Sequence, residues 1–221
     1  MVKLGLPWQL ADPLVGRPCL RAPIPEIAVA ADYLNEAVSA HLSNRSGLAE
    51  ELINQANMPV IREWSESLWG KASPHRQYRV AAGAPPILEQ TQRERLRMPS
   101  REEKCRLHSR DGYHCRYCGI PVIRKEIRDR LRGVYPRALP WGRTNATQHA
   151  AFQAMWAQYD HVLPHARGGT NEITNMVVAC APCNFGRMDY TLEEVGLLDP
   201  RTREPLWSAW DGLERLLRHR E

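Results

Sequence analysis

Residues 159–184 read YDHVLPHARGGTNEITNMVVACAPCN, and the prediction of the fold starts from this stretch. The pattern is typical of a short strand over 158–164 and of a second one over 174–179. Between them, 166–171 reads ARGGTN, which is rich in residues that favour turns. The stretch therefore predicts a two-stranded hairpin with a long loop, followed directly by a Cys-x-x-Cys pair.

Two Cys-x-x-Cys pairs are present, Cys115 with Cys118 and Cys180 with Cys183, and 61 residues separate them. In a reducing compartment such pairs are more often metal ligands than disulfide halves. Four thiolates complete the tetrahedral coordination of a structural zinc ion, Zn²⁺. The pairs therefore predict a zinc site that fastens two distant segments together, and because such a site is coordinatively full, any catalysis needs a second site.

Side chains suited to phosphodiester hydrolysis lie beside the second pair. The reaction needs a base that activates water and a cation that stabilises developing negative charge. His161 has an unperturbed pKa of about 6.5, and Asp160 and Asn184 offer oxygen ligands suited to Mg²⁺ or Mn²⁺. Consecutive strand residues point to opposite faces, so we expect a bulge or the end of the strand to bring Asp160 and His161 to one site.

With the first cysteine pair, this stretch resembles the HNH endonuclease family. The similar features are Asp-His on a strand, a Pro three residues on, Arg-Gly-Gly in the loop, an Asn just before an apolar strand and the terminal Cys-x-x-Cys. The resemblance covers roughly residues 100–190. It implies an α+β, mostly helical fold in which a ββα-metal module, stabilised by the four-cysteine zinc, surrounds one catalytic cation.

The resemblance also implies a role for each matching residue. His161 would be the general base, Asp160 and Asn184 would hold the catalytic cation, and Asn175 would hold the loop and so orient His161. The last motif position, often His in the family, is Asn184 here. This resembles the variant of phage junction-resolving endonucleases and of the HNH domain of CRISPR effectors, in which Asn is a metal ligand.

Basic residues are concentrated next to the first cysteine pair. The chain has a net charge of +5, and residues 96–133 hold eleven basic and five acidic side chains, whereas residues 1–95 hold ten of each. This distribution indicates a phosphate-rich partner, with DNA favoured and RNA left open. The residues predicted to contact nucleic acid are Arg187, which follows the second pair, Arg167 in the loop, and Arg124, Arg128 and Arg132, which form a stripe on a helix over 123–132. The alternative is that this stripe is a solvated helix face.

The remaining segments are predicted to be mainly helical. Apolar spacing predicts helices over 26–42, 48–57 and 60–69, which make residues 1–95 a small all-α region with a linker at about 71–91. A capping box, Ser100-x-x-Glu103, predicts a helix to about residue 110. The nuclease-like module is expected over 96–190 with a long insert at 119–159, which includes a helix over 146–157. A C-terminal helical extension is expected over 191–221, with its helix at 205–219.

The most strongly supported function is a cytoplasmic, metal-dependent DNA endonuclease, with a role in phage defence or restriction. The longest window without a charged residue, 144–159, is too short and too polar to span a membrane. One alternative is a non-catalytic zinc module that binds nucleic acid or protein. Another is a nuclease subunit of a defence complex in which residues 1–95 dock onto a partner such as an ATPase.

Overall fold

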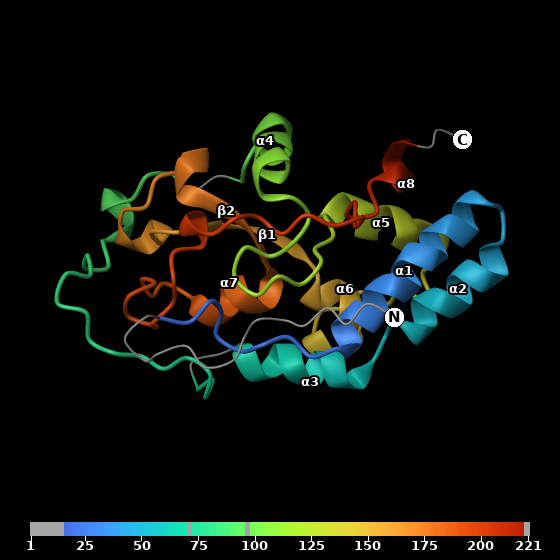
Figure 1. Ribbon diagram of the computed structural model, residues 1–221, viewed down its shortest axis with the longest axis horizontal. Helices are drawn as coiled ribbons and strands as arrows, with labels where there is room; N and C mark the ends of the chain where they lie inside the picture. Colours follow the sequence, from blue (N-terminus) through green and yellow to red (C-terminus); the bar gives the residue numbers. More distant parts are fainter. Residues whose placement is uncertain (1–15, 70–71, 96–97, 219–221) are drawn as a thin grey trace.

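The computed structural model of the protein describes residues 16–69, 72–95 and 98–218 (Figure 1). The fold is α+β and mostly helical, as predicted, with one two-stranded sheet among the described residues. The helices are α1 (Glu26–Leu42), α2 (Ser46–Gln55), α3 (Pro59–Leu68), α4 (Arg101–Asp111), α5 (Lys125–Val134), α6 (Ala150–Ala154), α7 (Ala181–Arg187) and α8 (Arg215–Arg218). Short 3-10 turns are η1 (Gln90–Gln92), η2 (Asn145–Thr147), η3 (His165–Arg167), η4 (Ile173–Asn175) and η5 (Pro200–Thr202).

The hairpin is at the centre of the fold. Strands β1 (Ala157–His161) and β2 (Met176–Cys180) pair antiparallel, in a register that runs from Ala157 opposite Cys180 to His161 opposite Met176. Every residue of β2 is buried, and α7 begins at the next residue and packs against both strands. The order strand, long loop, strand, helix is the ββα arrangement that the resemblance implies.

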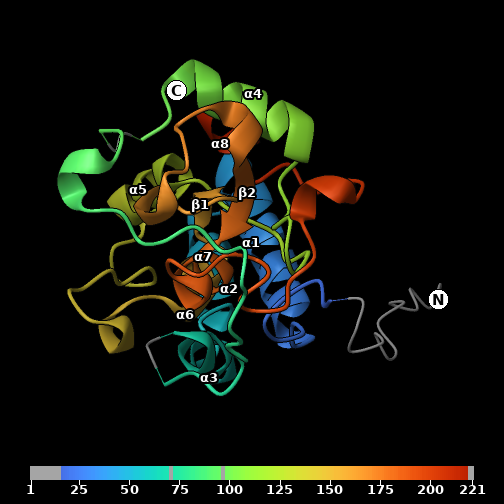
Figure 2. The same ribbon diagram turned by 90° about the vertical axis from the view of Figure 1, so that its left-hand side faces the viewer.

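The N-terminal helices cover one side of this unit. Helices α1 and α2 pack against each other, and α3 packs against both α6 and α7, as Figure 2 shows. Trp64 of α3 is almost completely buried, and its indole nitrogen donates to the carbonyl oxygen of Ala22. The buried apolar residues of these helices belong to the same core as those of the hairpin. The division into regions 1–95, 96–190 and 191–221 stays a prediction, but the described parts of all three share this core.

Most predicted helices form within a few residues of their expected bounds. Helix α1 has the predicted bounds, and α4 begins with the predicted capping box, since Ser100 Oγ accepts from Glu103 N and the Glu103 carboxylate accepts from Ser100 N. The helix predicted over 146–157 is shorter, because the chain first forms η2 and α6 begins only after His149, whose ring accepts from Phe152 N.

The C-terminal helix also differs from the prediction. Only α8 forms, because Gly212 and Leu213 adopt positive φ angles of 67° and 64° and so interrupt a right-handed helix. The segment before them instead runs across the front of the hairpin in Figure 1, and Trp210 Nε1 donates to Val122 O over 3.2 Å. Apolar spacing predicts a helix here, but the contacts that hold this segment extended are long-range. The predicted end of the helix, at His219, lies outside the described residues.

In the described part of the chain, no helix combines the length and the apolar character needed to cross a bilayer.

Candidate metal centre and active site

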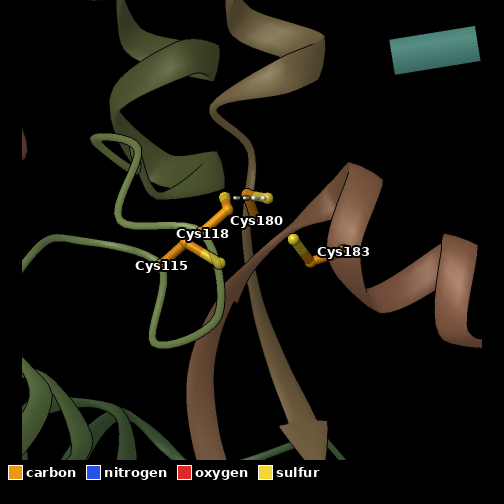
Figure 3. A group of neighbouring side chains, drawn as sticks. All are labelled: Cys115, Cys118, Cys180 and Cys183. Carbon is orange, nitrogen blue, oxygen red and sulfur yellow. Dashed lines mark hydrogen bonds between the residues drawn. The ribbon is translucent and has the colours of Figure 1, made fainter. Parts of the chain in front are cut away.

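The four cysteines of the two pairs converge at one point (Figure 3). Their sulfur atoms all lie within 4.8 Å of one another, and all four side chains are buried. Cys115 and Cys118 lie on a turn that Gly119, with φ of 78°, allows to close, whereas Cys180 ends β2 and Cys183 lies in the first turn of α7. Chain segments far apart in sequence therefore supply two ligands each.

The donor set fits a structural zinc ion. Burial acts to raise the pKa of the Cys115 thiol, but hydrogen bonds with the other three thiols outweigh it and hold that pKa well below its usual value. Four closely spaced thiols, of which one ionises readily, are the soft ligands that Zn²⁺ prefers in a closed tetrahedral site. Bound zinc would clamp the turn onto the hairpin, where Arg116 N already donates to Val178 O over 2.8 Å.

Asp160 lies on the buried side of β1. Its carboxylate pairs with Arg187, with 2.6 Å between Oδ1 and Nη2 and 3.2 Å between Oδ2 and Nε, and it accepts a hydrogen bond from the Tyr117 hydroxyl over 2.7 Å. Asp160 is 5% exposed and Arg187 is 1% exposed. Both carboxylate oxygens therefore already have protein partners. Asn184, the other predicted cation ligand, is half-buried on α7, one residue after Cys183.

His161 is the last residue of β1 and is half-buried. Its ring Nε2 lies 3.2 Å from Oδ1 of Asn171, and its ring centroid lies 5.8 Å from that of His165. Burial is the largest influence on the ring and lowers the pKa of His161 below its usual value, although the hydrogen bond with Asn171 and the nearby Asp160 act to raise it. An imidazole with a lowered pKa is neutral at neutral pH, which a general base requires.

Strand β1 ends at His161, and its pairing has no bulge between Asp160 and His161, so the expectation that an irregularity brings the two side chains to one site stays a prediction. Pairing is regular through Asp160, opposite Val177, and His161 follows as the terminal pair opposite Met176. The two adjacent side chains have separate partners: the carboxylate meets Arg187 and Tyr117, and the imidazole meets Asn171.

Asn175 holds the loop between the strands. Its Oδ1 accepts from Leu163 N over 2.9 Å, and its Nδ2 donates to the carbonyl oxygens of Leu163 and Thr170, both over 3.1 Å. Gly169 lies directly beside these contacts, and a Cβ at that position would overlap the Leu163 carbonyl oxygen. Leu163 is two residues from His161, so these contacts are of the kind that the predicted loop-holding role requires.

The predicted nucleic-acid contacts mostly have protein partners in the structure. Arg187 is buried against Asp160, Arg167 pairs with Glu194 over 2.9 Å, and Arg124 pairs with both carboxylate oxygens of Glu214 over 2.5 and 2.6 Å. These guanidinium groups would reach a phosphate only after exchanging partners.

The three arginines of the predicted helical stripe also differ in their exposure to solvent. Arg124 precedes α5, and Arg128 is 5% exposed, with its guanidinium carbon 3.9 Å from the centre of the Trp141 ring. Of the three predicted stripe residues, only Arg132 is exposed.

Residues 88–95, which begin inside the predicted linker (about 71–91) and continue past its end, contact the site. Figure 1 shows the chain before α4 at the same end of the molecule as the hairpin loop. There, Leu88 N donates to Ala166 O over 2.8 Å, Glu94 O lies 2.5 Å from His165 Nε2, and Arg95 O accepts from Asn171 Nδ2 over 3.0 Å. Sequence reasoning did not single out Leu88, Glu94 or Arg95, because a segment without periodicity gives no signal of a long-range contact.

An antiparallel hairpin followed at once by a helix, with a four-cysteine cluster at their junction and a histidine at the strand end, defines a ββα module with a cluster that could hold zinc. Residues 150–194 match the family model described as HNH endonuclease, which confirms the resemblance for this part of the chain. Neither a curated protein nor a solved structure matches the chain. Residues 150–194 are therefore similar to HNH endonucleases, and the match covers about a fifth of the chain.

Proposed function

We propose that this protein is a metal-dependent endonuclease that hydrolyses phosphodiester bonds of DNA, with His161 as the general base. The observation that carries the proposal is the position of His161 within the segment that matches the HNH endonuclease family: a half-buried imidazole at the end of β1, with one ring nitrogen hydrogen-bonded. Its lowered pKa leaves it neutral and able to accept a proton from water.

The second part of the proposal concerns the cation. Asp160 and Asn184 would hold Mg²⁺ or Mn²⁺, because carboxylate and amide oxygens are ligands that hard divalent cations prefer. The bound ion would stabilise negative charge on the phosphorane and on the leaving 3′ oxygen. Because Arg187 pairs with the Asp160 carboxylate in the structure, cation binding requires that this ion pair open.

Nicking of supercoiled plasmid in the presence of Mg²⁺ or Mn²⁺ tests the catalytic proposal. We expect the zinc-loaded wild type to nick the plasmid and His161→Ala to be slower by about 10²–10⁴-fold, the usual contribution of a general base. His41→Ala is the matched control, because His41 lies on α1 and contacts the Tyr135 hydroxyl. Equal cleavage by His161→Ala and wild type would show that His161 is not the base. Tight DNA binding by the wild type, without cleavage in any of several divalent cations, would favour a non-catalytic zinc module.

We further propose a role in phage defence or restriction, in which residues 1–95 contact a partner protein such as an ATPase. The balanced charge of this region, with ten basic and ten acidic side chains, favours protein contact over phosphate contact. Co-expression with the genomic neighbours, followed by size-exclusion chromatography, tests this. Co-elution that depends on residues 1–95 is expected, and elution of the chain as an isolated monomer in every combination contradicts it.

A further inference from the structure

Asn171 connects the proposed base to the N-terminal half of the chain. The residue is 2% exposed, and both ends of its side-chain amide have a partner. Oδ1 lies 3.2 Å from His161 Nε2, and Nδ2 donates to Arg95 O over 3.0 Å. The Asn171 backbone N–H donates to the Glu94 carboxylate over 2.9 Å. Two side-chain contacts and one backbone contact therefore hold Asn171 in one orientation.

The chemistry of these partners determines which way the Asn171 amide faces. A backbone carbonyl can only accept a hydrogen bond, so the NH₂ end of the amide must face Arg95. The oxygen then faces His161, and since this oxygen can only accept, His161 Nε2 must carry the proton. In the neutral imidazole, Nδ1 is then the nitrogen with the free lone pair.

We propose that Asn171 is a positioning residue that fixes the tautomer and the ring orientation of His161, so that Nδ1 is the nitrogen that faces the reaction. The catalytic consequence rests on the proposed function, whereas the tautomer itself does not. Such a hydrogen bond to the far nitrogen is the general way in which proteins select the reactive nitrogen of a histidine.

The proposal also gives part of the N-terminal half a role at the site. Glu94 holds Asn171 through its side chain and contacts His165 Nε2 through its carbonyl oxygen, 2.5 Å away. Arg95 holds the Asn171 amide through its carbonyl oxygen. Residues 94 and 95 therefore contact the two side chains that lie next to the His161 ring, Asn171 and His165, although they lie outside the segment that matches the family.

Nitrogen-15 NMR of the histidine rings in zinc-loaded protein tests the tautomer directly. At a pH where the imidazole is neutral, we expect wild-type His161 to show one tautomer, protonated at Nε2, with this proton protected from exchange with water. The resonances are assigned by their absence in His161→Ala. A wild-type ring that is protonated at Nδ1, or an Nε2 proton that exchanges freely, would overturn the proposal without any need for an Asn171 variant.

Two variants of Asn171 then separate positioning from folding. Asn171→Leu removes the acceptor and should lose the protected Nε2 proton, whereas Asn171→Asp keeps an acceptor and should retain it. Asn57→Leu is the control, because Asn57 also accepts through its side chain, from Ala150 N, but has no contact with His161. A protected Nε2 proton that persists in Asn171→Leu would overturn the proposal.

Steady-state cleavage adds the catalytic readout. Asn171→Leu should lower kcat by roughly 10–10²-fold with KM within about twofold of wild type, because substrate binding is kept and only the base is misplaced. Asn171→Asp should recover most of this loss. A rise in KM with kcat unchanged would contradict a positioning role. If the tautomer is as expected but the wild type cleaves no DNA, the proposed function fails and the structural assignment of Asn171 stands.

Discussion

Arg187 and Asp160 form an ion pair in the interior of the protein, with 2.6 Å between Nη2 and Oδ1. Their side chains are 1% and 5% exposed. Arg187 also donates to the carbonyl oxygens of His161 and Tyr190, and Tyr117 donates to the Asp160 carboxylate. The pair therefore connects α7 and the turn that carries Cys115 and Cys118 to the strand that ends at His161.

Replacement of Arg187 by Met should be strongly destabilising. It leaves the Asp160 carboxylate buried without its counter-charge, a change that reduces the free energy of unfolding by roughly 3–5 kcal/mol. Urea unfolding of zinc-loaded protein at neutral pH measures this. The double variant with Asp160→Asn should recover a large part of the loss, because the neutral amide no longer needs a cation and can still accept from Tyr117. A loss below about 1 kcal/mol in the single variant would contradict the prediction that the pair is structural.

Removal of zinc should disrupt the hairpin. We expect one zinc ion per wild-type chain and a large fall in thermal stability when a chelator removes it, because a structural zinc site contributes folding free energy directly. Cys183→Ser should lose the ion and show the same fall. Cys105→Ser is the matched control, since Cys105 is exposed on α4 and away from the cluster. Elemental analysis and circular dichroism measure these outcomes, and a zinc-free protein as stable as the loaded one would refute them.

The parts of the fold that depend on local pattern could be predicted from the sequence. Helix α1 has the expected bounds because its buried residues, such as Ile27, Leu34 and Val38, recur at helical spacing. The four-cysteine cluster could be predicted as well, because the spacing of the two Cys-x-x-Cys pairs is typical of metal ligands.

Contacts between distant charged or polar residues could not be predicted in this way. Arg124 fits a basic stripe by its spacing, yet it pairs with Glu214, ninety residues further along the chain. The contact of Asn171 with Arg95 likewise depends on where a segment without periodicity crosses the loop. The polarity of these side chains can be read from the sequence. Whether each one contacts a phosphate, water or another residue depends on the fold.

Acid should destabilise the protein partly through His149. This ring is almost fully buried, and its Nε2 lies 2.8 Å from Ile53 O. Burial lowers the pKa of His149 from 6.5 to about 4. Between these two pKa values the unfolded chain binds a proton at His149 that the folded protein does not bind. The contribution of neutral His149 to the free energy of unfolding is therefore complete above about pH 6.5 and is lost as the pH falls to about 4. The full loss corresponds to about 3 kcal/mol.

A comparison with His149→Gln isolates this contribution from other acid effects, including zinc release. Urea unfolding gives the difference in stability between wild type and variant at each pH. The advantage of the wild type should shrink by about 2 kcal/mol between pH 7.5 and pH 4.5, since only the wild type carries the titrating ring. A difference that stays constant over this range would show that His149 does not titrate between the two states.

Alanine at position 169 should disturb the loop that leads from His161. The new Cβ would overlap the Leu163 carbonyl oxygen and lie 2.9 Å from Asn175 Nδ2, so the hydrogen bonds between Leu163 and Asn175 would be displaced. Because backbone rather than a flexible side chain lies in the way, we expect a loss of at least about 2 kcal/mol in the free energy of unfolding.

Gly133→Ala is the matched control. A Cβ at Gly133 meets nothing within 4 Å, and the residue lies in α5, where alanine favours the helix by about 0.5–1 kcal/mol. The midpoint of chemical denaturation should therefore fall for Gly169→Ala and rise for Gly133→Ala. Cleavage should fall for Gly169→Ala and stay unchanged for Gly133→Ala, because only the first displaces the loop next to the base. A Gly169→Ala protein with wild-type stability would mean that the loop can accept the methyl group by a shift that leaves Asn175 in contact with Leu163.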